Sequence, residues 1–339
     1  MKYPLKIIAG ILGIGAAIAW SVKGVDFGEV AHILSRIDLL MTLGVLVLTT
    51  LNLLVRAYVW KFIVNPIKPV PIGHAFSSYL IGVFSNLFLP FKLGDVAQGY
   101  SLGRREDVSK ISAVSAVLIQ RVFEVTSLLL IMAGMAMFIS LPLLFQRRTV
   151  ALGLLIMMAV AGLFIMFRKR DVVLSSLETV LRRISPEFAN SISRAFDRFL
   201  AGTKALHNVS DVVKILSLSF LSWVVQIVMV RLTAAALGIK IDMAASGIVL
   251  LIINLGITIP LAPGNIGTFQ VFSILALSLF SIAKPEALTF SIIFQLIQGV
   301  PVIIGGGFSL LQEAFFTRRS KVMHGTEGKN ALTGRNAIL

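Results

Sequence analysis

The stretch NLFLPFKLGD, at residues 86–95, interrupts an apolar segment of the chain. Pro90 removes a backbone N–H and ends a helix, Gly94 permits an unusual backbone angle, and Asp95 can cap the helix that begins there. A second apolar segment is interrupted in a similar way by PLAPGNIGTFQ, at residues 260–270. Backbone freed at membrane depth is tolerated only where it is buried in protein or lines a cavity. Both interruptions are therefore expected to mark a site or a gate.

The composition around these interruptions is that of a polytopic membrane protein. Of 339 residues, 57% are hydrophobic and 14% charged, whereas soluble domains hold about 45–50% apolar and 25% charged residues. Runs long enough to cross about 30 Å of hydrocarbon recur along the chain, at residues 39–64, 111–144, 150–167, 212–237 and 287–308. A first run, 5–22, is either a retained helix, which we favour, or a cleaved signal peptide. This pattern excludes an ordinary soluble enzyme.

The net charge and the number of Cys residues narrow the class of protein further. The net charge of +15 fits contact with anionic lipid head groups better than binding of nucleic acid, which is not expected. The chain has no Cys, which excludes disulfides and thiolate metal sites.

The order of spans and charges predicts an inverted repeat. Placing the N-terminus in the cytoplasm puts most loop Lys and Arg residues on the cytoplasmic side, as the positive-inside rule requires. Residues 39–144 and 212–308 then form two copies of one unit in opposite orientations, each with an element that is re-entrant or crosses twice; chance pseudo-symmetry is the alternative. Such repeats indicate a transporter with a central site. The predicted fold is an all-α polytopic bundle in the cytoplasmic (inner) membrane with both termini in the cytoplasm.

The remaining segments are polar. Residues 168–211 carry apolar side chains at helical spacing, and we expect two amphipathic helices whose basic residues meet anionic membrane lipid or simply face solvent. The tail, 317–339, has no periodicity and is expected to be disordered. Residues 1–316 are thus expected to form one transmembrane domain.

Polar side chains at membrane depth are the candidate substrate-binding residues. Arg121 lies about 15 Å along its helix, where a buried charge is costly, so it either pairs with Glu124 on the same face or handles substrate. Lys92 and nearby helix-end amides are suited to bind phosphate, unless Asp95 only caps and Lys92 only snorkels. Arg56, inside its own span, either snorkels or has a function. The substrate-binding candidates are Asn86, Lys92, Asp95, Gln98, Arg121, Glu124 and Arg231.

The candidate gate residues are those that break the two helices or lie beside the breaks: Pro90, Gly94, Pro260, Pro263, Gly264, Asn265, Gly267 and Gln270. The second break offers neutral hydrogen-bonding groups rather than charge. The sequence contains neither a constellation of metal ligands or nucleophiles nor a G-x-x-x-x-G-K-[ST] loop. We therefore assign no catalytic residue, metal or cofactor, and expect no ATPase in this chain.

These residues resemble the lysylphosphatidylglycerol synthase transmembrane domain, or flippase-like, family. The similarity spans roughly residues 5–316 and rests on the following positions: Asn86, Leu89-Pro90, Gly94-Asp95, Arg104, Arg121 with Glu124, residues 263–267 and Gln270. The family pattern usually has a basic residue where this chain has Gln98 and an acidic residue at Gln270. The resemblance implies an inverted-repeat fold that moves polar-headed lipids between leaflets. The aminoacyl-transfer domain of some relatives is not expected here.

The sequence therefore favours a flippase or scramblase for a phospholipid or a polyprenyl-phosphate-linked lipid. The alternatives are a membrane-embedded transferase or hydrolase, with Lys92, Asp95 and Glu124 as catalytic groups, and a small-solute transporter or accessory subunit of an envelope-synthesis complex. The expected partners are the lipid substrate and anionic membrane lipids, and a homo-oligomer is compatible with these features.

Overall fold

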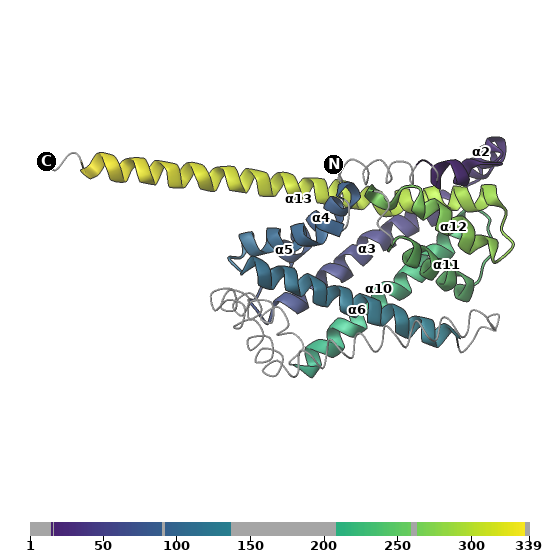
Figure 1. The fold of residues 1–339 in the computed structure, drawn as a ribbon, viewed down its shortest axis with the longest axis horizontal. Helices are drawn as coiled ribbons and strands as arrows, with labels where there is room; N and C mark the ends of the chain where they lie inside the picture. Colours follow the sequence, from purple (N-terminus) through teal and green to yellow (C-terminus); the bar gives the residue numbers. More distant parts are fainter. Residues whose placement is uncertain (1–14, 16, 90–91, 137–207, 259–262, 336–339) are drawn as a thin grey trace, which may run out of the picture.

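The computed structural model describes residues 15, 17–89, 92–136, 208–258 and 263–335. The expected span at 150–167, most of the first run and of the linker 168–211, Pro90 and Pro260 lie outside these residues. All regular structure in the described residues is helical (Figure 1). Four of these helices are long and apolar enough to cross a membrane: Leu39–Val64, Lys110–Met132, Val209–Ala236 and Lys284–Phe315. The prediction of an all-α polytopic membrane protein is confirmed.

The first repeat consists of α3 (Leu39–Val64), α4 (Ile72–Phe88), α5 (Leu93–Arg105) and α6 (Lys110–Ala136). Asp38 begins α3 by accepting the Met41 N–H at 2.9 Å, as N-cap residues do. At 1.5 Å per residue, α4 and α5 are about 26 and 20 Å long, and they pack against each other as the two arms of one hairpin. The first broken element is thus a helical hairpin.

The second repeat consists of α10 (Val209–Ala236), α11 (Met243–Gly256), the 3-10 turn η3 (Pro263–Asn265), α12 (Thr268–Ser278) and α13 (Lys284–Arg335). The short helices α11 and α12 form the matching hairpin. Its tip needs left-handed backbone, which glycine adopts without steric cost: φ is +62° at Gly264 and +86° at Gly267. The second broken element is therefore a helical hairpin as well.

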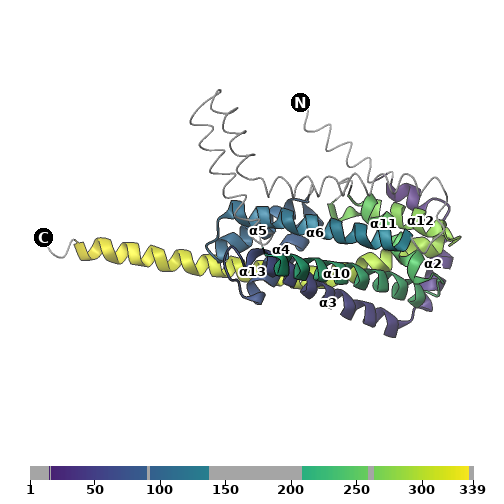
Figure 2. The ribbon, with the colours of Figure 1, turned by 90° about the horizontal axis from the view of Figure 1, so that it is seen from below.

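The two repeats lie in opposite directions. The Asp38 N–H, at the start of α3, donates to the Ala236 carbonyl at the end of α10, at 2.9 Å, so the two first helices pack antiparallel. In both views the α4–α5 hairpin lies at one end of the bundle and the α11–α12 hairpin at the other (Figures 1 and 2). Every helix contact within the first repeat has its counterpart in the second, and α3 contacts α13 as α10 contacts α6.

Each end of the bundle has its own set of connections. At one end, which we call the Lys68 end, Lys68 donates to the Glu106 carbonyl and His74 pairs with the Glu106 carboxylate. At the other, the Lys240 end, Lys284 Nζ donates to the carbonyls of Trp20 and Lys23, both at 2.7 Å. The short helix α2 (Phe27–Ser35) lies at this second end (Figure 1).

The tips of the two hairpins meet inside the bundle. η3 contacts α4, and a Cβ placed on Gly264 would lie 3.2 Å from the Leu87 carbonyl oxygen. The arms of the first hairpin also touch backbone to backbone, because a Cβ on Gly94 would lie 2.2 Å from the Gly82 carbonyl oxygen. The tips of both breaks are therefore brought to one region of the bundle.

The tail differs from the expectation of disorder. Residues 317–335 continue α13 to Arg335, and the end of this helix projects from the bundle (Figure 1). The segment contains no proline after Pro301, and extending an existing helix needs no new nucleation. The prediction failed because absence of apolar periodicity indicates an unpacked segment, whether coil or solvated helix.

Candidate functional site

Four charged side chains form a compact cluster, which we call the charged quartet: Arg56 of α3, Asp95 of α5, and Arg121 and Glu124 of α6. Arg121 donates through Nε to Asp95 Oδ2 at 2.9 Å and through Nη2 to Asp95 Oδ1 at 2.6 Å. Its Nη1 donates to Glu124 Oε2 at 2.6 Å. Arg56 Nη1 lies 3.7 Å from Glu124 Oε1. Two guanidinium groups thus face two carboxylates, and their formal charges cancel.

The hairpin fold places Asp95 against Arg121. Asn86, near the end of α4, donates through Nδ2 to Asp95 Oδ1 at 2.9 Å and accepts the Gly94 N–H at 2.8 Å. One amide therefore joins both arms of the hairpin, next to the close contact between Gly82 and Gly94. Any side chain larger than hydrogen at Gly94 would push the arms apart and move Asp95.

Two amides of the first repeat position Glu124, and a helix of the second repeat positions Arg56. Gln98 Nε2 donates to Gln120 Oε1 at 3.0 Å, and Gln120 Nε2 donates to Glu124 Oε1 at 3.1 Å. On the other side, Arg56 Nε donates to Ser222 Oγ at 2.9 Å, and its guanidinium lies over the Trp223 ring. The quartet is therefore built at the interface between the repeats.

The members of the quartet differ in exposure. The Glu124 side chain is 10% exposed and that of Asp95 18%, whereas Arg121 is 30% exposed. Three of the five N–H donors of Arg121 are used by the two carboxylates, which leaves two. Arg121 is the member best placed to reach a further ligand.

Lys92 supplies a positive charge that the quartet does not cancel. It lies at the tip of the first hairpin with φ +55°, is exposed, and forms no ion pair with another described residue. Its ammonium group is within electrostatic range of Arg121, Asp95 and Glu124. The site as a whole therefore carries one excess positive charge.

Two local expectations at this hairpin were wrong. The N-cap of α5 is Lys92, whose side chain makes no capping hydrogen bond, and Asp95 is the third residue of the helix. The Asp95 carboxylate accepts charge-assisted hydrogen bonds from Arg121 instead, because these bonds are stronger than bonds from neutral backbone amides. The unusual backbone angle is likewise at Lys92 and not at Gly94, where glycine is needed for the close approach to Gly82.

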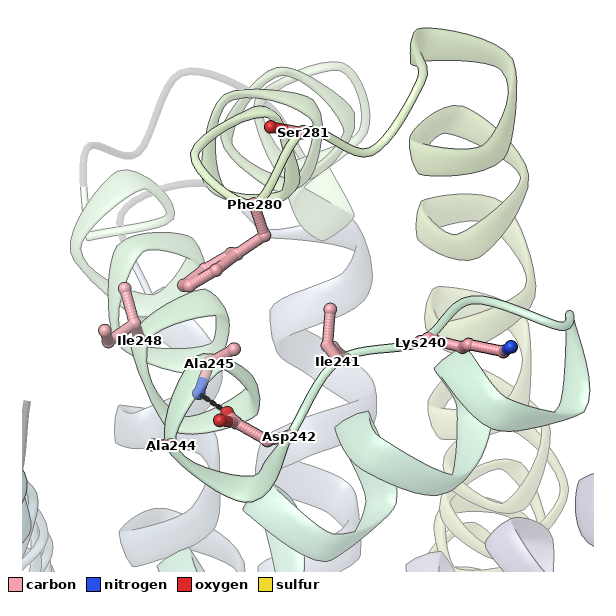
Figure 3. Close-up of a pocket in the computed structure, with 8 residues that line it drawn as sticks. All are labelled: Lys240, Ile241, Asp242, Ala244, Ala245, Ile248, Phe280 and Ser281. Atoms are coloured by element: carbon pink, nitrogen blue, oxygen red, sulfur yellow. Dashed lines mark hydrogen bonds between the residues drawn. The ribbon is translucent and has the colours of Figure 1, made fainter.

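Arg231 is not part of this cluster. It is nine residues beyond Ser222, about 14 Å along α10, where it lines a cavity of about 570 Å³ with Lys240 and Asp242. Figure 3 shows the neighbouring cavity of about 410 Å³, in which Asp242 accepts the Ala245 N–H at 2.7 Å and Phe280 lines one side. Both cavities are at the Lys240 end.

The second break is held by glutamines. Gln270 Oε1 accepts the Gly267 N–H at 2.7 Å, and Gln270 Nε2 donates to Gln295 Oε1 at 2.6 Å. Gln295 Nε2 in turn donates to the Gly264 carbonyl at 2.9 Å. Pro263 and Asn265 belong to η3, and Asn265 has φ +57°.

Sequence reasoning brought Asn86, Lys92, Asp95, Gln98, Arg121 and Glu124 forward, and the structure places these six together. It left Arg56 outside the candidate set and missed Gln120, Ser222 and Gln295. A charge inside a span was the available signal for Arg56. Single amides or hydroxyls in apolar helices are too common to signal a site.

A bundle of inverted repeats with two helical hairpins and a charged cluster between them defines a polytopic helical membrane protein. The chain belongs to the lysylphosphatidylglycerol synthase TM region family, whose profile matches residues 7–306.

Two curated relatives support this assignment. The UPF0104 membrane protein MJ1078 of Methanocaldococcus jannaschii is 26% identical over 230 residues, which cover 66% of this chain and 92% of that protein. Glycosyltransferase AglD of Haloferax volcanii is 21% identical over 344 residues, which cover 91% of this chain and 54% of that protein. The chain thus spans about half the length of this second relative. No solved structure matches the chain significantly.

Proposed function

We propose that this protein translocates a polar-headed lipid, with a phosphate in its head group, between the leaflets of the cytoplasmic membrane without an ATPase of its own. The observation that carries the proposal is the charged quartet with Lys92, beside the tips of two helical hairpins. A bare phosphate in hydrocarbon is strongly disfavoured. The lipid chains need no such shelter, so the protein has to shield only the head group.

Binding uses the donors that the quartet leaves free. Arg121 keeps two N–H groups, which suit phosphate oxygens, and Lys92 adds a point charge. Because the quartet is neutral, the charge of Lys92 is available to balance the phosphate. The head group therefore gains charge-assisted hydrogen bonds without breaking the structural pairs.

Release depends on the same pairs. Asp95 keeps two N–H groups of Arg121 through its hydrogen bonds, so a phosphate bonds only to the donors that remain and is held less tightly than by a free guanidinium. A transport site must bind well enough to admit its substrate and weakly enough to release it. Movement of the Gly264 tip against Leu87 would then open the path toward the second repeat.

The proposed orientation places the Lys68 end in the cytoplasm. Lys61, Lys68, Arg104, Arg105 and Lys110 gather at or near the helix ends on this side. Positive loops are retained on the cytoplasmic side and attract anionic lipid. Both termini would then be cytoplasmic, and the quartet would face substrate from the inner leaflet.

Leaflet exchange of labelled lipids in proteoliposomes tests this function, with phospholipids and polyprenyl-phosphate sugars as substrates. The intact protein should exchange at least one phosphate-bearing lipid, and Arg121→Ala should slow the exchange about a hundredfold, because loss of one partner of a buried charge pair costs roughly 2–5 kcal/mol. Lys214→Ala, at an exposed ion pair with Asp211, is the matched control and should exchange at the normal rate. Exchange of no lipid by the intact protein would overturn the proposal.

A second candidate is a membrane-embedded transferase. The relative from Haloferax volcanii, glycosyltransferase AglD, favours it by its name. The same proteoliposomes, supplied with a labelled lipid-linked sugar and acceptor lipids, distinguish the two. Sugar transfer without leaflet exchange would replace the flippase by the enzyme.

A further inference from the structure

The second repeat carries a neutral copy of the charged quartet. The matching positions are the eighteenth residue of α3 and α10, the third of α5 and α12, and the twelfth and fifteenth of α6 and α13. In the first repeat these positions hold Arg56, Asp95, Arg121 and Glu124, and in the second they hold Gln226, Gln270, Gln295 and Gln298. We call the second set the glutamine quartet.

One contact of the charged quartet has a direct counterpart in the glutamine quartet. Asp95 and Arg121 join the second arm of one hairpin to α6 at 2.6 Å, and Gln270 and Gln295 join the second arm of the other to α13 at 2.6 Å. Each break is thus closed by one side-chain pair at the same positions. The two sets differ in charge, and the pairs of Glu124 with Arg121 and Arg56 have no counterpart among the described contacts of Gln298.

The symmetry also predicts a partner for Gln226. Arg56 bonds to Ser222, the fourteenth residue of α10. The fourteenth residue of α3 is Asn52, so the reciprocal pair across the α3–α10 interface is Gln226 with Asn52.

This reciprocal pair is buried and unsatisfied. Gln226 is 8% exposed and Asn52 7%, and neither Gln226 Nε2 nor Asn52 Oδ1 has a hydrogen-bond partner within the described residues. Gln298 also forms no hydrogen bond with another described side chain or carbonyl. Buried polar atoms are almost always paired. One donor on α10 and one acceptor on α3 are therefore available to a ligand at the interface between the repeats.

We infer that the glutamine quartet with Asn52 is a second head-group subsite, which binds an uncharged, hydroxyl-bearing group such as the sugar or polyol of a lipid head group. This inference rests on the proposed function. A hydroxyl both donates and accepts, as does a carboxamide, so Gln226 and Asn52 match it without supplying charge. The phosphate stays with Arg121 and Lys92, and the neutral part of the head group is recognised across the hairpin tips.

Apolar substitutions of matching size test the subsite. Gln226→Leu and Asn52→Leu, singly and together, remove the unpaired atoms. Because removing unpaired polar atoms is close to neutral for folding, the midpoint of thermal unfolding should not fall. Ser219→Ala is the control, since it removes another buried, unpartnered polar atom from α10 outside the quartet.

Binding is measured in nanodiscs with three probes: diglucosyl diacylglycerol, phosphatidic acid and free maltose. The double variant should bind the glycolipid about tenfold more weakly, the loss of one or two hydrogen bonds, and phosphatidic acid within twofold of normal. Maltose should not displace the glycolipid, because the subsite serves a membrane-anchored head group. Equal glycolipid binding by intact and double-variant protein, or equal loss of both lipids, would overturn the inference.

Leaflet exchange of the same lipids separates this inference from the function on which it rests. If the intact protein exchanges phosphatidic acid but glycolipid binding ignores Gln226 and Asn52, the subsite is wrong and the translocation function stands. If glycolipid binding depends on both residues but no lipid is exchanged, the subsite stands and the translocation function is wrong.

Discussion

The charged quartet and the glutamine quartet occupy the same helix positions in the two repeats, yet one is built from three ion pairs and the other from neutral amides. Both close a helical hairpin against the last helix of its repeat. The backbone therefore requires a hydrogen-bonded pair at this joint, but it does not require charge. If folding alone needed the charges, the second repeat would need them as well.

The free-energy costs of burying an ion pair and of burying a neutral amide pair support this interpretation. Burying ions costs more than their attraction returns unless the geometry is excellent, and neutral replacements are often as stable. The glutamine pair shows that this fold accommodates such a replacement. The joint alone therefore does not account for the charges of the first repeat, and the proposed binding of phosphate would account for them.

The largest expected effect is the loss of Glu124, which separates two cations. Glu124→Leu leaves Arg56 without a carboxylate partner and leaves Arg121 with Asp95 alone. Breaking a buried ion pair in this way costs about 3–5 kcal/mol. The variant should unfold at a markedly lower temperature in detergent. Gln298→Leu, at the matching position of α13, should change stability by less than about 0.5 kcal/mol. Similar losses in both variants would contradict the comparison.

A second variant converts the charged joint into the neutral one. Asp95→Gln with Arg121→Gln should restore a hydrogen bond like that of Gln270 and Gln295, and the remaining Arg56 and Glu124 still balance each other. The double variant should therefore be more stable than either single variant, a coupling that a double-mutant cycle measures. It should nevertheless exchange phosphate-bearing lipids about a hundredfold more slowly, because it has lost its guanidinium fork. Normal exchange would show that the charges serve only the fold.

The repeats themselves were predictable from the sequence, because spans and breaks follow from apolar length and from proline and glycine. The span expected at 39–64 has those bounds in the structure, and that expected at 212–237 is Val209–Ala236. The sequence left open whether each broken element is re-entrant or crosses twice, because a 17-residue apolar helix such as α4 lies close to the length of a span. The structure shows that each element is a helical hairpin.

The details of the site depend on contacts between distant residues. From the local sequence, Asp95 is expected to cap a helix. Only the packing of α6 against α5 shows that its carboxylate accepts hydrogen bonds from Arg121 instead. The glutamine quartet has no local signal either. It is visible only once the two repeats are aligned helix by helix.

A smaller change tests the geometry of the fork. Arg121→Lys keeps the charge but loses the planar, bidentate donor set. Its exchange rate should lie between those of intact protein and Arg121→Ala, about tenfold below the intact protein. Thermal unfolding should show a modest loss, since one ammonium group cannot bond both Asp95 oxygens and Glu124 equally well. A rate equal to that of intact protein would show that charge alone suffices.

The smallest effect is expected at Lys92, which lies outside both quartets. Its counterpart in the second repeat is Gly267, the residue before α12, so this position carries charge in one repeat and no side chain in the other. Lys92→Gln should leave the unfolding temperature unchanged, because the side chain is exposed and forms no ion pair with a described residue. It should raise the lipid concentration at half-maximal exchange several-fold and weaken its dependence on ionic strength, since screening acts mainly on accessible charges. Equal salt dependence in intact and variant protein would mean that Lys92 does not meet the head group, and that the phosphate is held by Arg121 alone.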